Sequence, residues 1–142
     1  MPEIRNNAAA TMSVAASALK AQPARLRVIA ENLANASSTA RTPGGEPYRR
    51  QIPVFSATEV EGADGANGVK MTKIEADPSA FKTAYEPGHP GADAQGYVKL
   101  PNVDSLVEAM DMRNAQRAYE ANLNVIETSR AMQMRTLDLL KR

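Results

Sequence analysis

The chain has 142 residues, no cysteine, no tryptophan and a formal net charge of +1. This length predicts one domain with one modest core, and the lack of cysteine excludes disulfides, thiol catalysis and cysteine-ligated metal. Balanced charge and an aromatic content of only 4% argue against a nucleic-acid partner, which would require a basic or base-stacking surface.

The first twenty residues, MPEIRNNAAATMSVAASALK, lack the basic region and the apolar stretch of a cleaved signal peptide. No apolar run in the chain approaches the roughly 20 residues that a membrane span needs. By default, these features predict a soluble, cytoplasmic protein with no direct membrane span.

An Ala-rich helix is predicted over residues 7–36, because apolar residues recur there every seven positions, which is the spacing of a coiled-coil seam. The seam consists of Met12, Leu19, Leu26 and Leu33, with Ala15, Gln22, Ile29 and Ala36 at the companion position. Pro23 removes one backbone donor, so a bend is expected near Leu19. A second helix that begins at Pro23 is the alternative, but the unchanged heptad phase favours the bend.

Two asparagines occupy the end of this helix. Asn35 is predicted to be a C-terminal capping residue in the left-handed conformation. For Asn32 two interpretations remain open: its amide is solvated, or it bonds a neighbouring helix and fixes the helix register, as polar residues do in coiled coils.

Four short alternating segments predict strands in the middle of the chain, which also holds all eight glycines. The segments are YRRQIPVF, GVKMTKIE, AFKTAYE and GYVKL. They are expected to form one small antiparallel sheet with one covered face. Pro53 indicates an edge strand or a bulge, and the basic residues of Tyr48–Arg50 are expected to lie on a solvated strand face.

A second long helix is predicted from Asn102, its expected N-cap, to the end of the chain, with a length of about 57 Å. Its seven-residue row is Ala118, Val125, Met132 and Leu139, flanked by Tyr119, Ile126 and Leu140. We therefore expect an α+β fold, in which long N- and C-terminal helices pair as an antiparallel coiled coil around a small central antiparallel β insertion. Residues 1–36 and 102–142 would form the helical domain, and residues 37–101 the β-rich insertion.

Further apolar residues lie outside both rows, including Val14 and Val28 on the first helix and Leu137 on the second. A two-helix coil buries only a narrow stripe, so these residues require additional helices. Because the chain offers no third helix, the missing neighbours are expected to come from other subunits, which indicates an assembling protein.

No enzymatic motif is found. His89 is the only histidine and lies between Pro and Gly residues, so it is interpreted as a turn residue without a chemical role. No metal-binding or cofactor-binding residues are predicted.

The segment SALKAQPARLRVIAENLANASST resembles the N-terminal signature of the bacterial flagellar axial proteins of rod and hook, where a helix ends in an Asn-Leu-Ala-Asn motif. The segments RTPGGEPYRRQ, DPSAFKTAYEPGHPGADAQGYVKLPNV and VEAMDMRNAQRAYEANLNVIETSRAM are similar to the basal-body proximal rod proteins of FlgC type within that family. The resemblance runs from about Ser13 to Leu139. Pro23 departs from it, where relatives usually carry a basic or polar helix former.

This resemblance implies a non-enzymatic structural subunit of the flagellar rod that assembles helically, transmits torque and lines the export channel. It also implies export by the flagellar type III apparatus without a cleaved signal peptide, and a place in the periplasmic part of the basal body. The implied partners are copies of the chain, other rod subunits, the membrane ring and the export apparatus. Another rod subunit of the same family and a cytoplasmic coiled-coil adaptor are the alternatives.

The resemblance places Asn32, Leu33, Ala34 and Asn35 in the family motif and matches Arg117–Asn122 to its C-terminal segment. Residues of this motif and of the two heptad rows are predicted to serve in helix packing and assembly. They are Met12, Leu19, Leu26, Ile29, Asn32, Leu33, Asn35, Ala118, Tyr119, Val125, Ile126, Met132 and Leu139.

Overall fold

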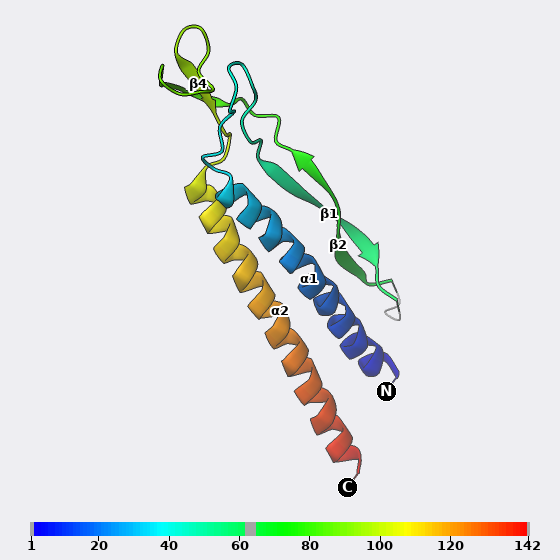
Figure 1. The fold of residues 1–142 in the computed structure, drawn as a ribbon. Coiled ribbons are helices and arrows are strands. Elements are labelled where there is room, and N and C mark those ends of the chain that lie inside the picture. The colour runs from blue at the N-terminus through cyan, green and yellow to red at the C-terminus, as the bar shows by residue number, and fades with distance from the viewer. Residues whose placement is uncertain (1, 62–64, 142) are drawn as a thin grey trace. The chain divides into compact units, whose positions relative to one another are not determined.

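A computed structural model describes residues 2–61 and 65–141 and shows two long helices, with four strands between them in the sequence (Figure 1). The elements follow the chain in this order: α1 (Pro2–Ala34), β1 (Gln51–Glu59), β2 (Asn67–Ala76), β3 (Lys82–Tyr85), β4 (Tyr97–Leu100) and α2 (Ser105–Leu140). The predicted α+β class and the positions of both helices and all four strands are confirmed.

The chain forms two compact units, and α1, α2, β1 and β2 each contribute to both. Unit 1 comprises Met1–Leu26, Val54–Lys73 and Asn114–Arg142, and unit 2 comprises Arg27–Pro53 and Ile74–Arg113. Each unit therefore combines helical and strand segments. The predicted separation into a helical domain and a β insertion remains a prediction.

Helix α1 continues through Pro23 as one 33-residue helix, so a separate second helix does not form. At its end, Asn35 Nδ2 donates to the Glu31 carbonyl oxygen at 2.9 Å and Asn35 Oδ1 accepts from the Ser38 hydroxyl at 3.1 Å. Asn35 therefore caps the helix through its side chain. The predicted left-handed conformation is wrong, because the only described residues with positive φ are glycines.

The strands form two separate two-stranded sheets, β1–β2 and β3–β4, so the prediction of one sheet is wrong. In the antiparallel β3–β4 pair, Ala84 lies opposite Val98, which is buried, and Tyr85 lies opposite Tyr97. Both tyrosines are exposed, and their rings meet edge to face with centroids 5.3 Å apart. The covered face of this hairpin is therefore the one that carries Ala84 and Val98.

The β1–β2 hairpin is fixed to α1 inside unit 1 by one serine. Ser17 Oγ accepts a hydrogen bond from the Val69 backbone N–H at 3.0 Å and donates to the Val14 carbonyl oxygen at 2.7 Å. A Cβ at Gly68 would collide with Ser17 and with Val60. Glycine at this position therefore allows the strand to approach the helix closely.

Helix α2 begins after Asp104, not after Asn102. Asp104 Oδ1 accepts hydrogen bonds from the backbone N–H groups of Leu106 and Val107 at 2.9 and 3.3 Å, which is the geometry of an N-cap. The predicted role of Asn102 as the cap is therefore wrong. From Ser105 the helix runs for 36 residues without Pro or Gly.

Small residues make up much of the core. Ala15, Ala21 and Ala115 are buried in unit 1, and the buried apolar residues of unit 2 are Val28, Ile29, Val98 and Val103. Val28 is 0% exposed within the single chain, so the expectation that it needs another subunit is wrong.

Candidate functional site

The Asn32 amide lies at the centre of a set of hydrogen bonds in unit 2, which we call the polar network (Asn32, Tyr48, Arg50, Gln51, Asp77, Asn102 and Glu108). Asn32 Nδ2 donates to the Gln51 carbonyl oxygen at 2.9 Å and to Glu108 Oε2 at 3.2 Å. Asn32 Oδ1 accepts from the Tyr48 hydroxyl and from the Gln51 backbone N–H, both at 2.9 Å. The solvated interpretation of Asn32 is therefore wrong. Its amide bonds the other long helix through Glu108, inside one subunit.

Glu108 is a carboxylate at 1% exposure, and burial of a charge is costly unless the charge is paired. Its Oε1 accepts a hydrogen bond from Arg50 Nε at 2.5 Å. Arg50 also contacts Asp77 at 3.3 Å and Asp111 at 3.8 Å. Burial alone lowers the pKa of the Arg50 guanidinium, but Glu108 and then Asp77 outweigh this and raise that pKa above its ordinary value. Arg50 is therefore ion-paired, and its expected place on a solvated strand face is wrong.

Asn102 links the segment before α2 to the segment after β2. Its Oδ1 accepts from the Arg50 backbone N–H at 2.8 Å, and its Nδ2 donates to the Ser79 hydroxyl at 2.9 Å. Asp77 Oδ1 in turn accepts from the Ser79 backbone N–H at 2.8 Å. Hydrogen bonds from Ser79, and then from Arg50, lower the pKa of the Asp77 carboxyl.

Tyr48 completes the polar network from the loop before β1. Burial, followed by the charges of Glu31 and Glu108, raises the pKa of its hydroxyl. The hydroxyl therefore stays protonated at neutral pH and donates to Asn32. In this network each buried polar group has a hydrogen-bond partner. It therefore favours one arrangement of the helices and strands that carry these groups, because another arrangement would leave buried polar groups unpaired.

His89 holds two loops of unit 2 together. Its Nδ1 accepts from the Gly91 backbone N–H at 2.9 Å, and its Nε2 lies 3.1 Å from the Thr39 hydroxyl oxygen. A Cβ at Gly91 would collide with the Ala40 carbonyl oxygen, so the two loops approach closely here. His89 is therefore a bridging residue and not a turn residue without partners.

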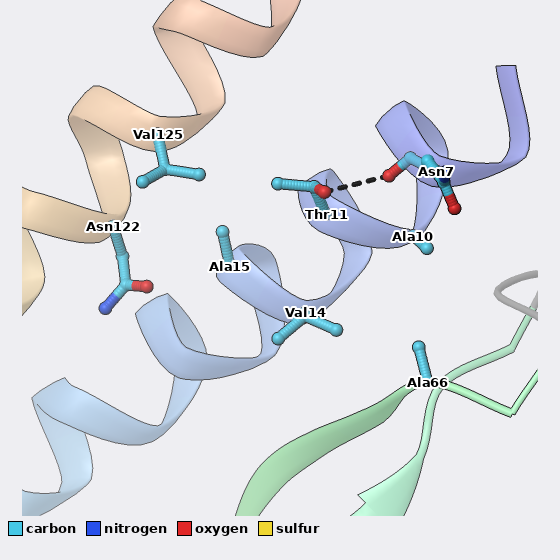
Figure 2. Close-up of a pocket in the computed structure, with 8 residues that line it drawn as sticks. All are labelled: Asn7, Ala10, Thr11, Val14, Ala15, Ala66, Asn122 and Val125. Carbon is cyan, nitrogen blue, oxygen red and sulfur yellow. Dashed lines mark hydrogen bonds between the residues drawn. The ribbon is translucent and has the colours of Figure 1, made fainter. Parts of the chain in front are cut away.

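A shallow groove in unit 1 is lined by Ala, Val, Thr and Asn side chains of α1 and α2 and by the turn that follows β1 (Figure 2). In the close-up, Asn122 and Val125 of α2 face Thr11 and Ala15 of α1, and Ala66 lies at the hairpin side. Among the eight described residues that line this groove, none has a titratable side chain.

The C-terminal half of α2 carries a series of exposed apolar side chains in unit 1. We call this surface the α2 end; it comprises Met132, Met134, Leu137, Leu139 and Leu140, which are 58–74% exposed. Five large apolar residues in nine positions exceed the isolated exposed residues that are normal on a protein surface.

The predicted packing residues have different environments in the single chain. Ile29 and Asn32 are buried, and most of the others are partly buried: Met12, Leu19, Leu26, Leu33, Asn35, Ala118 and Ile126. Tyr119, Val125, Met132 and Leu139 are exposed, from 38% to 74%. Within one subunit, the covered side of α2 carries the predicted residues Ala118 and Ile126 together with Ala115, Asn122 and Ser129. The assembly role of the predicted residues remains a prediction.

Sequence reasoning missed Glu108, Arg50 and Tyr48. In the sequence, Glu108 has the pattern of an ordinary acidic residue in the first turn of a helix, where the helix dipole stabilises a negative charge. One signal was available: Glu108 precedes Ala115, which is buried, by one heptad, so the two residues share the covered side of α2.

In the described parts of the chain, no group of three or more His, Cys, Asp or Glu residues is placed to hold a metal ion. A search of the same residues finds no helix with the length and apolar character needed to cross a membrane.

Two family models match the chain. "Flagella basal body rod protein" matches residues 12–41, and "Flagellar basal body rod FlgEFG protein C-terminal" matches residues 94–139. These matches cover most of α1 and all of α2 except Leu140, and leave β1, β2 and β3 outside both models.

Curated relatives extend the similarity through the middle of the chain. The flagellar basal-body rod protein FlgC of Agrobacterium fabrum is 46% identical, with 93% of this chain and 94% of the relative covered. FlgC of Escherichia coli O6:H1 is 45% identical over 89% of this chain and 92% of the relative. FlgC of Bacillus subtilis is 40% identical, with coverage of 92% and 97%.

Proposed function

Because this chain belongs to the FlgC family of flagellar basal-body rod proteins and is a structural subunit of the rod, we propose how its fold serves that role. The two terminal helices pair as an antiparallel coiled coil, and subunits assemble helically through them. The assembled helices transmit torque and line the export channel, while the strands face outward.

One observation carries this proposal: the α2 end remains exposed in the single chain although its residues are strongly apolar. Burial of a Leu or Met side chain contributes roughly 1.5–3 kcal/mol, so the five residues supply a substantial driving force for association. The small side chains that line the groove in unit 1 also allow helices to approach closely.

The polar network gives each subunit one fixed arrangement at the end of α1 and the start of α2. A helical assembly repeats every contact between subunits. Subunits that differed in the register of α1 against α2 would therefore not fit the same contacts. We therefore assign Asn32 to organisation within the subunit and assign Met132 and Leu139 to contacts between subunits.

The location proposed for the chain is the periplasmic part of the basal body, reached through the flagellar type III apparatus without a cleaved signal peptide. Its partners are copies of the chain, other rod subunits, the membrane ring and the export apparatus. Its role is structural, without catalysis or a cofactor. The relatives described above are all basal-body rod proteins, which supports this role.

Leu139→Asp tests the proposal. Leu139 is 74% exposed, so the substitution should leave the thermal midpoint of the purified subunit unchanged, yet it places a carboxylate in the contact that assembly would bury. We expect a non-motile strain whose detergent-resistant basal bodies lack the subunit. Ala131→Asp is the matched control, because Ala131 is exposed on the same helix and should tolerate the same charge.

Normal motility of the Leu139→Asp strain would contradict the proposed assembly surface. Fractionation of the wild type provides a second test, because a cytoplasmic adaptor would remain in the cytosol whereas a rod subunit is recovered with basal bodies.

A further inference from the structure

We propose that the α2 end of one subunit binds the exposed start of α2 in a second copy of the chain, head to tail. The α2 start consists of Asp104, Leu106, Val107 and Met110. This inference rests on the proposed function and adds the identity of the partner surface.

The α2 start is apolar on its exposed side. Leu106 and Met110 are separated by four positions, so they share one helix face, and they are 71% and 58% exposed. Val107 lies beside them and is also exposed. Like the α2 end, this surface presents large side chains that no described element of its own unit covers.

The charges of the two surfaces are complementary. The charged residues of positions 104–113 are Asp104, Glu108, Asp111 and Arg113. Glu108 is buried and paired with Arg50, and the two remaining carboxylates exceed the one arginine, so negative charge is in excess at the α2 start. Around the α2 end, the charged residues of positions 130–141 are Arg130, Arg135, Asp138 and Lys141, with positive charge in excess. Opposite charge around two apolar patches steers their association and fixes its orientation.

Because the two surfaces are different parts of one helix, their contact is heterologous. A heterologous contact leaves one unused surface at each end of the assembly, so it propagates into a ring or an open helical filament. A contact between two identical surfaces would stop at a dimer.

The lack of cysteine in the chain permits a direct test by disulfide cross-linking. Leu106→Cys and Leu139→Cys are combined in one chain, expressed as the only copy in cells, and basal bodies are isolated and oxidised. A disulfide requires Cα atoms within about 7 Å, so a second pair, Met110→Cys with Leu140→Cys, covers a shift along the helix.

We expect a ladder of cross-linked oligomers on a non-reducing gel for at least one pair. Each of the four single-cysteine variants should remain monomeric, because identical surfaces do not meet. As a matched control, Leu106→Cys with Ala131→Cys should give no ladder.

Three outcomes would overturn the inference: no ladder from either pair although the subunit is present in basal bodies, equal cross-linking of the single variants, or disulfides to a different rod protein that carries an added cysteine. Absence of the wild-type subunit from basal bodies would contradict the proposed function instead.

Discussion

Asn32 Nδ2 lies 3.2 Å from Glu108 Oε2, and both side chains are 1% exposed. This hydrogen bond joins the last turn of α1 to the first turn of α2 across 76 positions of sequence. The amide is suited to this position because it donates to a carboxylate with one atom and accepts from Tyr48 and Gln51 with the other. An aspartate, which is similar in shape, only accepts when ionised.

Asn32→Asp should therefore destabilise the subunit by about 3 kcal/mol at neutral pH, because a second buried carboxylate would face Glu108. Repulsion between two adjacent carboxylates raises the pKa of one of them. The loss of stability is therefore complete above that raised pKa and becomes smaller as pH falls through it. Urea denaturation of wild type and variant between pH 7 and pH 4 measures the difference.

Asn124→Asp is the control, because Asn124 is exposed on α2, so the new carboxylate remains in solvent. A pH-independent deficit in Asn32→Asp would show that lost hydrogen bonds, and not charge repulsion, explain its effect.

The lowered pKa of Asp77 predicts that the stability of unit 2 decreases in acid. Its pKa in the folded chain is lowered below the ordinary 3.8, so the fold favours the ionised form. Stability from this group is therefore complete above the ordinary pKa and is lost as pH falls through the lowered value. Asp77→Asn should be less stable than wild type at pH 7, and the two should converge as pH falls below the lowered pKa of Asp77. A constant difference across this range would contradict the assigned contribution.

The two glycines that flank His89 should respond differently to alanine. Gly91→Ala places a Cβ against the Ala40 carbonyl oxygen, a backbone atom that cannot move without its loop, and should cost about 1–3 kcal/mol. Gly88→Ala meets no atom within 4 Å and should be neutral or slightly stabilising. Thermal unfolding distinguishes them, and equal midpoints would show that the two loops are not held together at Gly91.

Pro23→Ala should stabilise the isolated subunit. A proline inside a helix costs about 3 kcal/mol relative to alanine, because it removes a donor and crowds the preceding turn. The reverse change at an exposed position of the same helix, Ala30→Pro, should destabilise it by a similar amount. A lower midpoint for Pro23→Ala would mean that the helix geometry is built around the proline.

The helices were predictable because seven-residue spacing and a lack of breakers are local properties of the sequence. The strands were predictable from alternation for the same reason. The pairing of the strands was not predictable, because alternation shows which face a residue lies on but not which strand lies next to it. A single sheet was therefore expected in place of the two sheets β1–β2 and β3–β4.

The polar network was largely unpredictable because its bonds join distant residues. Asn32 was recognised as unusual, but Glu108 lies 76 positions away and has the same local pattern as an exposed helical glutamate. Arg50 likewise belongs to a short basic cluster, and only its ion pairs show that its charge is used internally. The exposure of Leu137, in contrast, followed from an excess of apolar positions over available partners, whereas Met132 and Leu139 belong to the row that was expected to pair with the first helix and are exposed in the single chain.

The two-stranded form of the β1–β2 sheet also has a consequence for solubility. Every strand of such a sheet has an outer edge, and free edges attract strands of other molecules. In β2 the Val69 N–H is occupied by Ser17 of α1, and in β1 Pro53 has no N–H to offer. At these two positions, the edges of the sheet therefore cannot donate a backbone hydrogen bond to a strand of another molecule.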